Sequence, residues 1–121
     1  MKKSFDTLPW HDAVLLRISV DRTNAGEKDE VCLEIAWSED FSEKVVFKNC
    51  YAAHLYMNFG VICEEQILNA YVDEKDAELH NIRKKWADVA VNLDALQCFR
   101  IETSSTASVM RIYAKDFETR R

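Results

Sequence analysis

Histidine and carboxylate side chains are the groups best suited to acid–base chemistry, and they stand side by side at His11 and Asp12. A carboxylate can orient an imidazole so that the ring acts as a general base. Neighbours on an extended chain point to opposite faces, however, and the surrounding sequence indicates no nucleophile. We therefore expect a turn in which Asp12 caps the backbone, and we predict no enzyme. The alternative is a small enzyme or ligand-binding domain that uses His11, Asp12 and His54.

A metal site is the second chemistry to consider, because Cys50 and His54 lie close together in the sequence and Cys63 follows. Structural zinc sites usually pair their ligands two to four residues apart in both halves of the site. Neither Cys32 nor Cys98 has such a neighbour, so we predict no metal and no cofactor. Each cysteine lies in an apolar stretch, and we expect four reduced, mostly buried thiols.

Binding to nucleic acid would require a basic surface, and the one basic run with an aromatic neighbour lies at residues 80–86. Acidic residues flank this run at Glu78 and Asp88, so charge nearly cancels there. The whole chain carries a formal charge of −5 and has a pI of about 5.2. These values argue against binding to the phosphate backbone of a nucleic acid, and we predict no nucleic-acid partner.

The strongest charge asymmetry is acidic and lies between residues 27 and 43. Seven carboxylates minus the single Lys28 leave −6 in this span, which exceeds the net charge of the whole chain. We expect these residues to form a stripe along one side of a sheet that binds a basic protein partner. The alternative is a solvated edge whose charge resists aggregation. The predicted binding residues are Glu27, Asp29, Glu30, Glu34, Glu39, Asp40 and Glu43.

Alternating apolar residues predict three strands in the first half of the chain, at residues 13–20, 31–37 and 44–50. Short polar stretches separate them, which is typical of an antiparallel meander. Residues 57–62 are a candidate fourth strand, within a segment, Tyr51–Ile62, that the pattern leaves ambiguous. Two further strands, at residues 99–103 and 110–115, are joined by a hydroxyl-rich turn and predict a C-terminal hairpin.

Two helices are expected between these groups of strands. Residues 64–70 predict a short helix with acidic residues near its N-terminus. Leu79, Ile82, Trp86 and Val89 recur at helical spacing and predict an amphipathic helix. The predicted fold is α+β: an antiparallel sheet of about five to six strands with both helices packed on one face. One core should then contain Leu16, Trp37, Ile82, Trp86 and Ile112.

The length of 121 residues predicts a single domain over residues 1–121, because it lies near the commonest domain size. An apolar run of about 18 residues, as a membrane span requires, is missing from the sequence. The first residues lack the apolar segment of a signal peptide. We therefore expect a cytoplasmic protein without a membrane partner.

Several segments together resemble small bacterial α+β domains of the toxin-immunity type. They are Trp10-His11-Asp12-Ala13, the stretch from Val45 to Tyr51, Met57-Asn58-Phe59-Gly60, and Ile101 to Ser108. The resemblance implies a non-catalytic protein that binds and neutralises a partner toxin in the cytoplasm, and it implies no particular binding residues. Our leading expectation is therefore a protein-binding module with an acidic surface. A further alternative is a structural subunit that self-associates through Tyr51, Tyr56 and Phe59.

Overall fold

One antiparallel sheet of six strands forms most of the molecule in the computed structural model, which describes residues 4–121. The strand order is β1-β2-β3-β6-β5-β4, so the predicted N-terminal meander and C-terminal hairpin are both present. The α+β class and the antiparallel sheet are thereby confirmed. The strands are β1 Val14–Asn24, β2 Lys28–Ser38, β3 Phe41–Tyr56, β4 Ile67–Val72, β5 Gln97–Thr103 and β6 Val109–Arg120.

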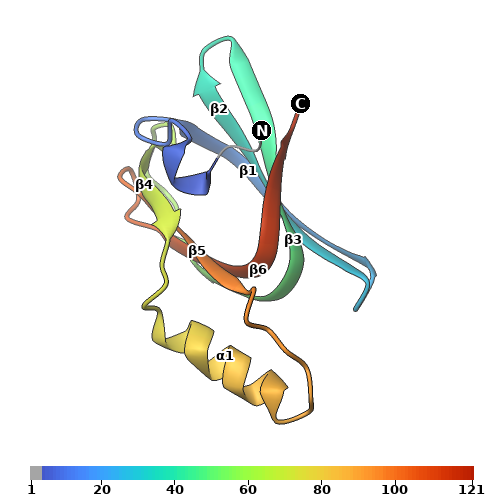
Figure 1. Ribbon diagram of the computed structural model, residues 1–121. Coiled ribbons are helices and arrows are strands. Elements are labelled where there is room, and N and C mark those ends of the chain that lie inside the picture. The colour runs from blue at the N-terminus through green and yellow to red at the C-terminus, as the bar shows by residue number, and fades with distance from the viewer. Residues whose placement is uncertain (1–3) are drawn as a thin grey trace.

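The sheet curls until its two edge strands meet at one end (Figure 1). The backbone N–H of Leu15 donates to the carbonyl of Glu65 at 2.8 Å, and the N–H of Ile67 donates to Ala13 at 2.7 Å. A single bridge, Val14 to Gln66, joins the start of β1 to the residue that precedes β4. The closure gives the sheet an enclosed concave side and brings residues 64–66 next to β1.

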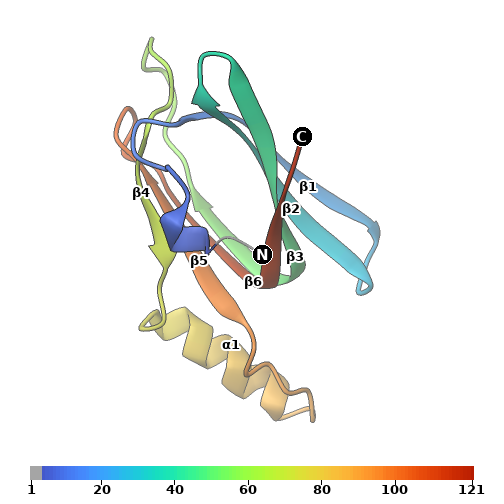
Figure 2. The same ribbon diagram turned by 45° about the horizontal axis from the view of Figure 1, so that its top comes forward.

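The concave side holds the main core, and the N-terminal segment fills it. A 3-10 turn, η1 Phe5–Thr7, lies on the concave side of the curled sheet (Figure 2). Phe5 is buried there, with its ring 4.9–5.8 Å from those of Trp10, Phe47, Phe99 and Phe117. Aromatic clusters of this kind bury a large apolar area and favour tilted or edge-to-face contacts.

The helix α1 Ala77–Ala87 packs on the outer side of the sheet and makes a second, separate core. Its buried residues Leu79 and Ile82 meet Leu93, Leu96, Cys98 and Tyr113. The prediction of one core between sheet and helix was therefore wrong. Ile112 belongs to the concave core and Ile82 to the outer one, because η1 occupies the place expected for the helix. Among residues 4–121, no helix has the length and apolar character needed to cross a membrane.

Trp86 and Leu16 are exposed rather than buried, which corrects two further predictions. Trp86 lies in the last turn of α1 and is 37% exposed. The pairing of β1 with β2 shifts register between Leu15 and Arg17, so Leu15 is 8% exposed and Leu16 is 54% exposed. A bulge of one residue moves the following side chains to the other face of the sheet.

The segment before the helix also differs from the prediction. Residues 64–70 were expected to form a short helix, but Ile67–Val72 form β4 and pair with β5. Tertiary pairing overrides local helix preference here, because β4 has partners on β5 and at the start of β1. Residues 57–62 contain no strand, and the ambiguous segment contributes Tyr51–Tyr56 to a longer β3 instead.

Candidate protein-binding groove

A groove of ≈ 600 Å³ lies where the start of β1, the β2–β3 turn and the segment before β4 come together. We call it the acidic groove. The closure of the sheet creates it, because the closure carries residues 64–66 to the side of β1 opposite β2. Its lining residues are Asp12, Val14, Leu16, Ala36, Trp37, Ser38, Glu39, Asp40, Phe41, Ser42, Glu64 and Gln66.

Four carboxylates line this groove, and among residues 4–121 no lysine or arginine does. Glu39 and Asp40 form the tight turn between β2 and β3, where Ser38 pairs with Phe41. Asp12 lies in a turn with a positive φ of 65°, and its carboxylate is 3.6 Å from His11 Nε2. Within residues 4–121, Glu39, Asp40 and Glu64 form no ion pair. A cleft with charges of one sign concentrates ions of the opposite sign.

Aromatic rings form part of the wall beside these carboxylates. Trp37 packs edge-on against Trp10 at 5.0 Å, and its indole N–H donates to Glu43 at 3.0 Å. These two contacts hold the indole in place. The guanidinium of Arg121 lies 4.7 Å from the centroid of the Phe41 ring, so this ring already accepts a cation. Aromatic faces attract guanidinium and ammonium groups.

The seven carboxylates predicted as a stripe do not share one environment. Glu39 and Asp40 line the acidic groove, whereas Glu27 lies in the β1–β2 turn at the other end of β2. The remaining four are engaged within the chain. Asp29 pairs with Arg22 at 3.1 Å, Glu34 with Arg17 at 3.1 Å and Glu30 with Arg120 at 4.0 Å, while Glu43 accepts the hydrogen bond from Trp37.

The histidines considered for catalysis lie on separate elements. His11 is exposed and its Nδ1 is 3.3 Å from the carbonyl of Leu68 in β4. His54 lies on β3, with its ring edge-on to Tyr113 at 5.2 Å. Within residues 4–121, no group of three or more histidine, cysteine or acidic side chains is arranged to hold a metal ion.

The four cysteines are free thiols that differ in accessibility. Burial raises the pKa of the Cys50 thiol to about 11 and that of Cys98 to about 12. Burial also raises the pKa of Cys32. Cys63 lies exposed in the loop before β4, where we had expected a mostly buried set. The three shifted thiols are poor nucleophiles near neutral pH, because the thiolate is the reactive form.

Comparison with known proteins gave no family assignment: no family model matches the chain, and no curated protein matches its sequence. The interpretation of the groove therefore depends on its own geometry. The sequence did identify Glu39 and Asp40, but it gave no role to Glu64, Trp37 or Phe41 in binding. Trp37 and Phe41 flank the turn that carries Glu39 and Asp40, whereas Glu64 joins them through the closure between β1 and residues 64–66, for which the local sequence pattern carries no signal.

Proposed function

We propose that the protein is a non-catalytic binding module of the cytoplasm, and that its acidic groove takes a basic segment of another protein. The supporting observation is that four carboxylates and, among residues 4–121, no lysine or arginine line the groove, next to the indole of Trp37. A lysine or arginine side chain entering the groove would meet negative charge and an aromatic face together.

The finer proposal is that of an immunity protein that neutralises a basic toxin by covering part of its surface. The likeness of the sequence to domains of the toxin-immunity type supports this choice of partner. Electrostatic complementarity also fits the task, because it speeds encounter and discriminates against wrong partners. Neutralisation by occlusion needs no catalytic group, and the separated positions of His11 and His54 suit a protein without one.

The test is isothermal titration with a short capped peptide that carries two arginines. The double variant Glu39→Gln/Asp40→Asn removes two charges from the groove and keeps the size of both side chains. It should weaken binding at least tenfold, which corresponds to about 1.4 kcal/mol. Glu34→Gln is the matched control, because that carboxylate lies outside the groove and is paired with Arg17. Equal affinity in the parent and the double variant would refute the proposal.

A second candidate function, self-association, is favoured by one observation. The loop after β3 exposes Phe59, Val61 and Ile62, with Phe59 at 82% exposed, and the neighbouring Tyr56 is exposed as well. Exposed apolar groups that lie together are typical of interaction surfaces. Solution mass decides this point: a mass above that of one 14.1 kDa chain, lowered by Phe59→Ser, would establish the second function.

A further inference from the structure

The sheet forks between β2 and β3. The pairing of these two strands ends at Val31 and Phe47, yet β3 continues to pair with β6 as far as Tyr56. Beyond the same point β2 pairs with β1 alone, out to Lys28. Figures 1 and 2 show the consequence, since the outer part of the β1–β2 hairpin projects away from the β3–β6 pair.

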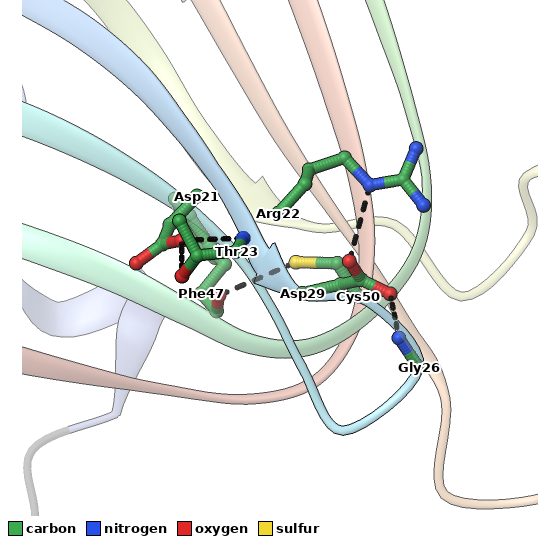
Figure 3. Close-up of polar contacts among 7 residues, drawn as sticks. All are labelled: Asp21, Arg22, Thr23, Gly26, Asp29, Phe47 and Cys50. Carbon is green, nitrogen blue, oxygen red and sulfur yellow. Dashed lines mark hydrogen bonds and ion pairs between the residues drawn. The ribbon is translucent and has the colours of Figure 1, made fainter.

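Local backbone geometry at the fork explains why the strands separate. Asn49 has a positive φ of 56°, and the register of β3 with β6 shifts between Cys50 and Ala52. A positive φ and a bulge both bend a strand away from its former neighbour. The Cys50 thiol lies at the bend and donates to the carbonyl of Phe47 at 3.3 Å (Figure 3).

The fork leaves backbone hydrogen-bonding groups without a strand partner. Among residues 4–121, β3 from Lys48 to Tyr56 has β6 as its single neighbouring strand. The β3 residues from Ala53 onward are exposed, whereas Val45, Val46 and Phe47 before the bend are buried. An unpaired strand edge presents a row of N–H and C=O groups and is a ready template for another strand.

Two pockets lie in the space between the separating strands. One part, of ≈ 250 Å³, is lined by Val20, Val31, Ala52 and Ala53 together with polar residues of the hairpin. A second part, of ≈ 420 Å³, shares Cys50 and Tyr51 with the first and extends to Trp86 in the last turn of α1 and to Val91 beyond the helix. The rings of Tyr51 and Trp86 meet edge-on at 5.1 Å at this mouth. We call the two parts together the fork slot.

The hairpin wall of the fork slot is held in shape by its own hydrogen bonds (Figure 3). Asp29 accepts from Arg22 Nε at 3.1 Å and from the N–H of Gly26 at 3.0 Å. Asp21 accepts from the backbone and the hydroxyl of Thr23. Arg22 and Asp29 neutralise each other, and Glu30 pairs with Arg120 at 4.0 Å. Glu27 and Lys115 carry the remaining opposite charges of the lining, so the slot is close to neutral.

We propose that the fork slot binds a single extended segment of another protein, which adds to the free edge of β3 as a new strand. Main-chain hydrogen bonds would give affinity, and pockets for alternate side chains would give selectivity, as in other cases of strand addition. The small side chains Val20, Ala52 and Ala53 select an uncharged segment with apolar residues at alternate positions.

The occupant is a segment with both edges free, and this excludes β3 of a second copy of the chain. The slot has strand edges on two sides, β2 at residues 28–30 and β3 at residues 50–53. In a second copy, β3 already pairs with β6 along one edge and has no room to enter between two strands. The proposal is independent of the acidic groove, which lies at the other end of β2.

Hydrogen exchange of the β3 amides tests the proposal, with a panel of capped seven-residue peptides as probes. The peptides carry Val or Ile at alternate positions with Thr or Ser between. At least one should slow exchange of amides within residues 50–56 by tenfold or more. The same peptide with alternate backbone nitrogens methylated should give no protection, because it cannot complete the ladder on one of its edges.

Two variants provide the matched controls. Ala53→Trp places a large ring in the slot and should weaken the protective peptide at least tenfold, whereas Ala25→Trp adds the same ring at the exposed hairpin tip and should leave binding unchanged. The double variant Glu39→Gln/Asp40→Asn should also bind the peptide normally. The proposal is overturned if no peptide protects residues 50–56, if the methylated peptide protects equally, or if protection arises from dimerisation of the chain.

Discussion

The hydroxyl of Tyr113 on β6 donates a 2.8 Å hydrogen bond to Asp76, the residue that caps the N-terminus of α1. The same carboxylate oxygen accepts from the N–H of Leu79 at 3.0 Å, and Arg111 lies 3.6 Å from the other oxygen. Asp76 and Tyr113 are both buried. One carboxylate thus both starts the helix and fastens it to the outer face of the sheet.

Loss of this hydroxyl should therefore lower stability. We expect Tyr113→Phe to cost about 1.5–3 kcal/mol, the range for a hydrogen bond to a charged group. Asp76→Ala should cost more, because it also removes the helix cap and leaves the Tyr113 hydroxyl buried without its partner. Denaturant titration of both single variants and the double variant measures their coupling. Tyr56→Phe, at an exposed tyrosine, is the control, and a cost for Tyr113→Phe no larger than for this control would contradict the assignment.

The bulge in β1 predicts opposite effects for two adjacent leucines. Leu15→Ala should destabilise the protein by about 2–5 kcal/mol, because it removes a buried side chain from the concave core. Leu16→Ala should change stability by about 0.5 kcal/mol or less, as at other exposed positions. Urea unfolding of the two variants checks the register directly. A larger loss for Leu16→Ala than for Leu15→Ala would place the bulge elsewhere.

Cysteine reactivity should follow exposure and pKa. In the native protein at pH 8 we expect one fast-reacting thiol, Cys63, and Cys63→Ser should remove the fast phase in a colorimetric thiol assay. Unfolding should expose all four thiols. Fast labelling of Cys98 in the native protein would contradict the burial that raises its pKa to about 12.

The raised pKa values of Cys50 and Cys98 also make the free energy of unfolding depend on pH. Burial raises the pKa of Cys50 and Cys98 above their ordinary value of 9.0, so the folded chain holds these protons more tightly than the unfolded chain. Their contribution is complete below pH 9 and should decline as the pH rises toward 11 and 12. Cys98→Ala should flatten the decline measured by urea unfolding between pH 8.5 and 10.5. An unchanged slope in this variant would contradict the assignment.

Much of the fold followed from the sequence pattern, because alternating residues in β2, β5 and β6 report burial on one face directly. Three features did not follow. The bulge after Leu15 reverses the faces of β1, and a single inserted residue leaves no mark on composition. The strand at Ile67–Val72 forms because partners lie on both sides, which local propensity does not record. Burial of Phe5 inside the sheet places α1 on the outer face, where Trp86 stays exposed.

The candidate site was predictable only in part, for the same reason. Glu39 and Asp40 could be identified because residues 27–43 carry a large excess of negative charge. Asp29 and Glu34 differ from them because each pairs with an arginine on the neighbouring strand β1. Which side chains face each other across two strands depends on their register, which the sequence pattern does not give. Glu64 joins the groove through a contact between residues far apart in sequence.

The measurement that tests the central claim most directly is backbone amide chemical-shift mapping of the labelled protein with the two-arginine peptide. The acidic groove predicts shifts confined to residues 12–16, 36–42 and 64–66 and to the indole N–H of Trp37. They should fade at 1 M salt, where the screening length falls to about 3 Å. Shifts centred on Glu27, Asp29 and Glu30 at the hairpin, or no shifts at millimolar peptide, would contradict the account.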